Sequence, residues 1–303
     1  MTATALPLPV AVPTPRRRLG LLTLATALAP VTWGTTYVVT TEWLPPDRPL
    51  LAATVRALPA GLLLVAAGRR LPRGAWWGKA AVLGVLNMGA FFALLFVAAY
   101  RLPGGVAAVL GAAQPLLVAV LAVPLLGERL RARTLLLGLL GVAGVALIVV
   151  TGPVALDPVG VLAGLAGAAC MGSGVVLTKR WGRPVPVLAF TGWQLAAGGL
   201  FLLPLALAVE GLPPALTAGE AGGLLYLATV NTALAYVLWL RGVGELPTAR
   251  VSFLGLLSPV VAATAGWVLL DEVLSPLQLA GMTLALATVV LAQRSPTPTP
   301  RKD

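Results

Sequence analysis

Long apolar stretches separated by short polar breaks occupy almost the whole chain. An apolar run of about 20 residues is long enough to cross the hydrocarbon core of a bilayer as a helix, and membrane strands would need a strict alternation that these runs lack. The fold class predicted is therefore an all-α integral membrane protein with ten transmembrane helices. The predicted spans are residues 19–41, 50–67, 78–100, 103–126, 133–151, 158–178, 187–209, 221–240, 247–270 and 276–293.

The basic residues of the polar breaks fall mainly on one side of this path. With the N-terminus inside, 18 of the 21 basic residues lie on the inner side; the exceptions are Arg48 and Arg101 outside and Arg56 within a span. Loops rich in lysine and arginine resist translocation and stay cytoplasmic. The distribution predicts a multi-pass protein with both termini inside. The abundance of Arg, Ala, Gly, Leu and Pro is typical of a GC-rich bacterium, so the expected location is the bacterial cytoplasmic (inner) membrane.

Composition excludes several classes of protein. The chain has 303 residues, is 58% hydrophobic and only 10% charged, so ten spans leave no room for a soluble catalytic or nucleotide-binding domain. The net charge of +11 is explained by the loops beside the spans and does not indicate nucleic-acid binding. Histidine is absent and there is one cysteine, which excludes histidine-based catalysis, a histidine metal site and an intrachain disulfide.

Both ends of the chain are rich in proline. Residues 1–18 and 294–303 are expected to be flexible cytoplasmic tails. Arg16 to Arg18, an apolar run and Ala27-Leu28-Ala29 imitate a signal peptide with its cleavage site. The apolar run continues through Val39, however, and is then long enough to span the membrane, which favours a retained first helix.

The sequence repeats itself. A shift of 144 residues brings Asn87 onto Asn231, Pro115 onto Pro259 and Glu128 onto Glu272, and a shift of 138 brings Gly34 onto Gly172, Trp43 onto Trp181 and Gly61 onto Gly199. The two repeats are predicted at residues 19–151 and 158–293, with five spans each. An odd number of spans forces the two copies to face opposite ways across the membrane, which is the inverted repeat of secondary transporters.

This arrangement resembles the drug/metabolite transporter superfamily, in particular its EamA-domain branch. The matching residues are Trp33-Gly34, Tyr37, Arg56, Pro115, Gly127-Glu128-Arg129-Leu130, Pro259 and Asp271-Glu272-Val273-Leu274. The resemblance implies export or uptake of small metabolites, often amino acids or drug-like compounds, by a secondary mechanism without ATP. One departure is Gln194, which stands where the 138-residue shift would place a second Arg56, so a site symmetric about the pseudo-twofold axis is in doubt.

Polar groups within spans are functional candidates, because they are costly in lipid unless they face the bundle interior. Arg56 is either an anchor for a substrate carboxylate or a gating charge, or an arginine that snorkels outward to Glu42 or Asp47. Asn87 and Asn231 either bind substrate or hold helices together. Gln114 and Ser258 precede prolines that free a backbone carbonyl or simply kink the helix. The candidate residues of a central cavity are Trp33, Tyr37, Arg56, Asn87, Phe91, Gln114, Trp193, Gln194, Asn231, Tyr236 and Ser258.

Other polar and aromatic residues are better explained by structure. Trp43, Trp76, Trp77 and Trp181 lie near span ends and are expected in the interfacial belt. Glu128 and Glu272 end equivalent helices, where capping or pairing with a neighbouring loop is favoured over proton coupling. The chain has no nucleotide-binding, nucleophile-elbow or metal-ligand motif.

These observations favour a secondary transporter of small organic metabolites, an exporter by family resemblance, that works by alternating access. The alternatives are an integral-membrane enzyme acting on lipid-borne substrates and a channel-like protein. The expected partners are a small-molecule substrate and the lipid bilayer, with no nucleic acid and no cofactor, in a monomer or a homodimer. The substrate, the direction of transport and any coupling ion are left open.

Overall fold

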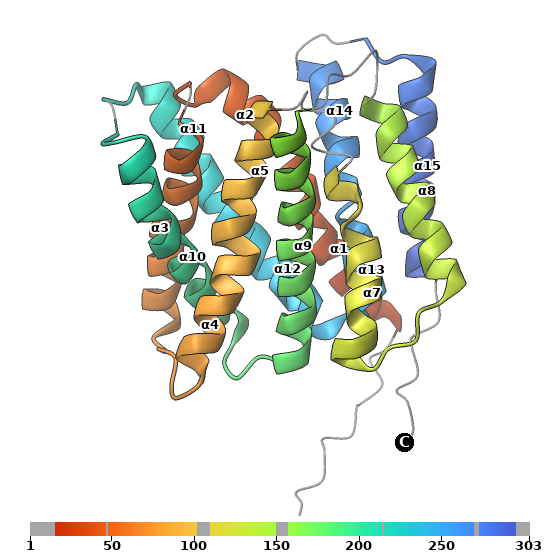
Figure 1. The fold of residues 1–303 in the computed structure, drawn as a ribbon, viewed down its shortest axis with the longest axis horizontal. Coiled ribbons are helices and arrows are strands. Elements are labelled where there is room, and N and C mark those ends of the chain that lie inside the picture. Colours follow the sequence, from red (N-terminus) through yellow and green to blue (C-terminus); the bar gives the residue numbers. More distant parts are fainter. Residues whose placement is uncertain are drawn as a thin grey trace, which may run out of the picture.

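The computed structural model describes residues 16–46, 48–101, 110–149, 157–213, 215–269 and 273–294. These residues form helices joined by short connections (Figure 1). The elements are α1 (Arg16–Gly34), α2 (Thr36–Trp43), α3 (Pro49–Gly68), α4 (Trp76–Gly84), η1 (Val85–Gly89), α5 (Ala90–Arg101), α7 (Gln114–Leu126), α8 (Ala132–Val149), α9 (Pro158–Trp181), α10 (Val187–Val209), α11 (Ala218–Ala228), η2 (Thr229–Leu234), α12 (Ala235–Glu245), α13 (Thr248–Leu254), α14 (Leu257–Leu269) and α15 (Pro276–Gln293).

Nine helical stretches of the described chain are long and apolar enough to cross a membrane, and each coincides with a predicted span. The predicted span 103–126 is represented by a shorter apolar helix, Leu110–Leu126; residues 102–109 lie outside the described part. One predicted span is too short at both ends. The span predicted at 221–240 is part of a continuous helical stretch, Ala218–Glu245, that begins at a polar cap and contains η2.

Side chains that cap the helices explain several of these boundaries. The Asp157 carboxylate accepts a hydrogen bond from the Gly160 amide at 3.0 Å, and Pro158 takes the first helical position of α9. Reciprocal capping boxes begin α11, from Thr217, and α15, from Ser275. Such caps satisfy amides that a helix cannot pair within its own first turn. Polar residues at the ends of apolar runs thus mark the start of these three helices.

The basic connections gather at one end of the bundle. Figure 1 shows the α3–α4, α7–α8 and α9–α10 connections together at its lower end. There the Trp193 indole of α10 donates to the Arg70 carbonyl of the α3–α4 connection at 2.7 Å, and Arg183 of the α9–α10 connection forms a 3.9 Å ion pair with Glu245 at the end of α12. We call this the basic end. The opposite end carries Arg48, whose guanidinium donates to the Glu210 carbonyl, so the charge asymmetry of the sequence is also an asymmetry of the fold.

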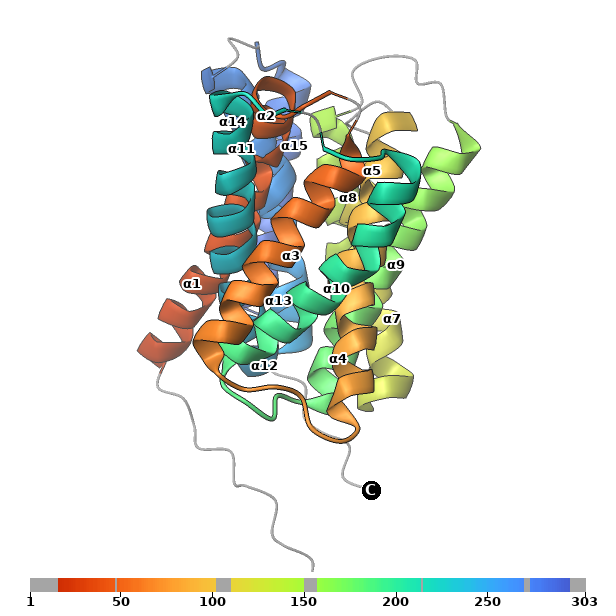
Figure 2. The ribbon, with the colours of Figure 1, turned by 90° about the vertical axis from the view of Figure 1, so that its left-hand side faces the viewer.

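Helices α3 and α10 pack against each other in opposite chain directions, with glycine at most of the contact points. Figure 2 shows the two side by side on the face toward the viewer. Gly199 meets the backbone of Leu58 and Gly61 meets that of Ala196, and toward the basic end Gly192 meets Val65. Small residues allow helix backbones to approach closely, which is how helices associate without a hydrophobic driving force in lipid. Helices α8 and α15 make a similar contact between Gly144 and Ala285.

Five helical stretches are interrupted near the middle of the bundle. α1 gives way to α2 at Thr35, and α13 to α14 at Gly255 and Leu256. The turn before Pro115 is held by a hydrogen bond from the Ala113 amide to the carbonyl of Leu110, three residues earlier, at 3.2 Å. The other two are the π-helical turns η1 and η2, which lie inside otherwise α-helical stretches. Such turns frequently occur at functional sites because they redirect side chains.

Candidate functional site

Arg56 lies in the interior and is held by neutral groups. Its side chain is only 3% exposed, so it does not snorkel to Glu42 or Asp47, and that alternative is wrong. Its Nε donates to the Thr232 hydroxyl at 2.9 Å and its Nη2 donates to the Asn231 side-chain oxygen at 2.7 Å. The guanidinium also sits 4.4 Å above the centre of the Phe92 ring. The arginine is therefore fixed in place by an amide, a hydroxyl and an aromatic face.

Asn231 connects Arg56 to the break between α1 and α2. Its amide nitrogen donates to the Thr32 carbonyl at 2.6 Å, and its side-chain oxygen also accepts from the Thr36 hydroxyl at 3.3 Å. The Trp33 indole donates to the Asn231 backbone carbonyl at 3.1 Å. Asn231 is fully buried, and both its side-chain oxygen and its nitrogen are hydrogen-bonded. The residue therefore holds helices together, one of the two expected roles, and orients Arg56.

A second buried contact joins Asn87 to Gln194. The Asn87 amide nitrogen donates to the Gln194 side-chain oxygen at 2.7 Å and, more weakly, to the Thr178 hydroxyl at 3.4 Å. Within the described part of the chain, the Asn87 oxygen and the Gln194 nitrogen have no hydrogen-bond partner, although both side chains are buried. Gly174 lies directly against the Asn87 amide, where a β-carbon would collide with it. This contact thus keeps one buried acceptor and one buried donor unpaired.

The two contacts occupy corresponding positions of the repeated sequence. Gln194 is Arg56 shifted by 138 residues, and Asn231 is Asn87 shifted by 144. The two asparagines lie in η2 and η1, so the π-helical turns also correspond. Arg56 and Gln194 each lie seven residues into their helix, α3 or α10, at a depth of about 10 Å. Because these helices begin at opposite ends of the bundle, the contacts lie at similar depths from opposite ends.

Aromatic side chains surround the Arg56 contact. The Trp33 ring lies 5.0 Å from Tyr236 and 5.2 Å from Trp239, and the Phe92 ring lies 6.0 Å from Tyr236, measured between ring centres. Phe91 contacts Phe92 at 5.6 Å. The candidates Trp33, Phe91 and Tyr236 are therefore brought together near Arg56 in an apolar wall with few polar groups, as a site for an organic molecule requires.

Three other candidates lie elsewhere. Trp193 packs with Trp76 and Phe190 at the basic end instead of joining the Arg56 contact. Gln114 is part of the proline break before α7 and approaches Gly255 in the break between α13 and α14. Ser258 lies in the first turn of α14, directly before Pro259, and its carbonyl lies beside Gly34.

One candidate has no described side chain, and some contact residues were not foreseen. Tyr37 lies in α2, and its side chain is outside the described part of the structure. Thr36, Thr178 and Thr232 take part in the two polar contacts but were not among the sequence candidates. Their positions in the sequence could have identified them. Thr232 directly follows Asn231, and threonine is common in membrane spans as a group that hydrogen-bonds between helices.

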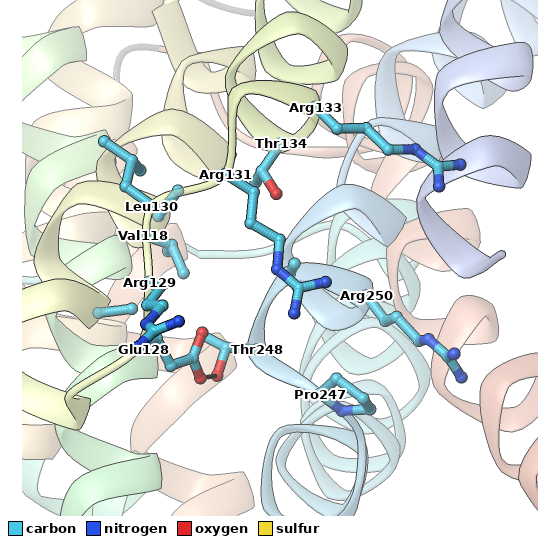
Figure 3. A pocket seen from close by; sticks show the side chains of 13 residues that line it. Val118, Glu128, Arg129, Leu130, Arg131, Arg133, Thr134, Pro247, Thr248 and Arg250 are labelled. Carbon is cyan, nitrogen blue, oxygen red and sulfur yellow. Dashed lines mark hydrogen bonds between the residues drawn. The ribbon is translucent and has the colours of Figure 1, made fainter. Parts of the chain in front are cut away.

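A pocket lined by charged residues opens at the basic end, between the α7–α8 connection and the start of α13 (Figure 3). The Thr248 hydroxyl donates to the Glu128 carboxylate at 2.7 Å across it. The Arg131 side chain extends from the α7–α8 connection into the space between this pair and Arg250. Glu128 thus pairs with a neighbouring element, as expected; its counterpart Glu272 lies outside the described residues. The bond links residues 19–151 to residues 158–293.

The acidic residues at the helix ends serve local structure. Glu210 accepts from the amides of Leu50 and Leu51 at 2.6 and 2.8 Å and so caps α3. Asp157 caps α9 and pairs with Arg101 at 3.4 Å, and the Gly160 amide is the main reason why the pKa of this carboxyl is lowered. Among the described residues, none of these carboxylates reaches Arg56. The protein's buried cation therefore has no acidic partner in the described part of the chain.

The model of the EamA-like transporter family matches the chain twice, at residues 19–150 and 158–293. Protein PecM of Dickeya dadantii (strain 3937) is 44% identical over 267 residues, which cover 88% of this chain and 90% of that protein. A protein of Streptantibioticus cattleyicolor named "Probable terminal-alkyne amino-acid exporter" is 33% identical over 255 residues, 82% of each chain. The Escherichia coli (strain K12) inner membrane transporter YedA is 30% identical and covered over 86% of each chain.

A solved crystal structure agrees with this assignment at the level of the fold. It superposes with a TM-score of 0.76 over 91% of this chain and 98% of the other, at 22% sequence identity. The apolar helices, the two matches of the family model and the named relatives agree that the protein is a multi-pass membrane transporter. The chain belongs to the EamA-like transporter family, within the drug/metabolite transporter superfamily.

Proposed function

We propose that this protein is a secondary transporter that exports small organic metabolites across the bacterial cytoplasmic membrane by alternating access. The single observation that carries the proposal is the pair of polar contacts, Arg56 with Asn231 and Gln194 with Asn87. Each contact joins one half of the chain to the other, and the two lie at similar depths from opposite ends. In a carrier built from two inverted halves, such contacts close the path on one side at a time.

The basic end is proposed to face the cytoplasm, because basic loops resist translocation. There the Thr248–Glu128 bond supports the Gln194–Asn87 contact in closing the inner side. Opening inward would separate these groups while Arg56 and Asn231 stay together, and opening outward would do the reverse. The breaks between α1 and α2, before α7, and between α13 and α14 are points at which helix segments can move without losing many backbone hydrogen bonds.

The direction and substrate class are inferred from the relatives. A protein named as an amino-acid exporter covers most of this chain at 33% identity, which supports export of amino acids or related small metabolites. The aromatic wall around Trp33 and Tyr236 suits an organic solute better than an inorganic ion.

Counterflow in proteoliposomes tests the proposal. Vesicles containing purified protein are loaded with an unlabelled amino acid and diluted into the same labelled compound at a low concentration. A carrier accumulates the label transiently above equilibrium, because influx of label is coupled to efflux of the unlabelled pool. A channel gives only equilibration. Failure to produce counterflow with any of the 20 standard amino acids or a set of drug-like amines, in vesicles shown to hold folded protein, would refute the proposal.

A further inference from the structure

Arg56 is a buried charge whose described partners are all neutral. Its guanidinium contacts the Asn231 oxygen, the Thr232 hydroxyl and the Phe92 ring. Burying a charge in low dielectric is costly unless an opposite charge is close. Neutral dipoles offset part of this cost, and an anion that reaches the same place would offset much more.

The acidic side chains in the described part of the chain have other bonding partners or are exposed. Glu128, Asp157, Glu210, Glu220 and Glu245 bind at helix ends or in connections, and Glu42 is exposed. The remaining acids are Asp47, Asp271, Glu272 and Asp303, which lie outside the described residues and between or beyond the predicted spans. Within the described chain, no side chain can supply the missing negative charge at the depth of Arg56.

We propose that the transported molecule supplies this charge: Arg56 binds a carboxylate of the substrate, which is a small organic acid or amino acid with an apolar or aromatic body. This inference rests on the proposed transport function and names its substrate class. A guanidinium matches a carboxylate geometrically through two parallel N–H donors. The substrate carboxylate replaces Asn231 and Thr232 as acceptor, and the body of the molecule lies against Trp33, Phe92 and Tyr236.

The repeat provides a matched variant for the test. Gln194 occupies the position that corresponds to Arg56 and is stable there, fully buried and bonded to an asparagine. Arg56→Gln therefore copies an arrangement that the protein already contains, and it removes the charge together with the Nε donor to Thr232. A second pair of variants leaves Arg56 in place. Thr232→Asp puts a carboxylate beside Nε and provides an internal anion, whereas Thr232→Asn has nearly the same size and is neutral.

The probes are acid and amide pairs: L-phenylalanine with L-phenylalaninamide, L-leucine with L-leucinamide, and indole-3-acetate with indole-3-acetamide. Binding is measured first, as the ligand-dependent rise in unfolding temperature of detergent-purified protein. At least one acid is expected to stabilise the wild type, and its amide to do so at least tenfold more weakly; Thr232→Asp is expected to bind that acid more weakly than its neutral control, Thr232→Asn. Arg56→Gln and Thr232→Asp are expected to lose at least tenfold in affinity for that acid, since a hydrogen bond to a charged group has about this effect.

Counterflow of the same compounds separates the two proposals. Binding that follows this pattern without counterflow in the wild type would refute transport and leave the carboxylate site standing. Counterflow of amides as fast as acids, or equal acid affinity in Thr232→Asp and Thr232→Asn, would overturn the assignment to Arg56 while leaving transport intact. Absence of binding by every acid in the wild type would also overturn it.

Discussion

Replacing glycine by alanine tests the packing of α3 against α10. The substitution should lower the free energy of unfolding at Gly199, which lies in this contact, and raise it at Gly222, which lies outside it. A β-carbon at Gly199 would lie 2.6 Å from both Cα and Cβ of Leu58 on α3. These atoms belong to or adjoin the backbone, so they cannot move aside as the end of a flexible side chain could. At Gly222 of α11, by contrast, a β-carbon would meet nothing within 4 Å.

The expected magnitudes follow from these distances. Restoring ordinary contact at Gly199 requires α3 and α10 to separate by roughly 1 Å, and overpacking of this kind costs about 1–3 kcal/mol. The gain in helix propensity from glycine to alanine, about 0.5–1 kcal/mol, offsets only part of it. We therefore expect Gly199→Ala to lower the free energy of unfolding by about 1–2 kcal/mol and Gly222→Ala to raise it by about 0.5 kcal/mol.

Equilibrium unfolding of purified protein in mixed micelles, with SDS as denaturant, measures both variants against the wild type. Leu58 is half a turn from Arg56, so Gly199→Ala should also weaken transport, whereas Gly222→Ala should leave it unchanged. Equal stability of the two variants would show that α3 and α10 are not in backbone contact at Gly199, and the packing argument would fail.

Further predictions concern the caps and the second polar contact. Glu210→Ala should lower the free energy of unfolding by about 1–2 kcal/mol, because two amides at the start of α3 lose their acceptor; Glu210→Gln, measured in the same SDS titration, should lose less. The pKa of Asp157 is lowered in the folded protein, so its stabilising effect is complete above the unfolded value of about 3.9 and disappears as the pH falls through the folded value. Thermal unfolding should therefore show the wild type more stable than Asp157→Asn near neutral pH and equal to it in strong acid; a constant difference would contradict this. Gly174→Ala should displace the Asn87 amide and reduce counterflow at least tenfold, whereas Gly20→Ala, at an uncrowded position, should not.

The spans were predictable because an apolar run of membrane length has few alternative structures, and caps such as Asp157 and Thr217 are local in sequence. The partner of Arg56 was not predictable from local pattern, since it lies 175 residues away. A correct alignment of the repeats pairs Asn87 with Asn231 and Arg56 with Gln194, but it does not reveal that the contacts run between halves. The π-helical turns have no recognisable signature in an apolar sequence.

Trp193 shows a different limit of sequence reasoning. It is adjacent to Gln194 and was grouped with it as a central residue. Consecutive residues of a helix point about 100° apart, so a neighbour of a central side chain commonly faces another direction. Gln194 contacts Asn87, whereas Trp193 faces Trp76 and the Arg70 carbonyl. Residue type alone does not identify the face of a helix that is apolar on all sides.

Under the proposed alternating-access mechanism, the difference between Arg56 and Gln194 makes the two states of the carrier unequal in energy. If the halves were identical, the inward-open and outward-open states would be equal in energy apart from the membrane's own asymmetry. Here one of the two contacts contains a buried cation, and the other is a neutral amide pair in which one donor and one acceptor have no partner among the described residues. Thr36 donates to the charged contact, while Gly174 at the corresponding position of the other half donates nothing from a side chain. Breaking the two contacts therefore has different costs, and an anion bound at Arg56 changes only one of them.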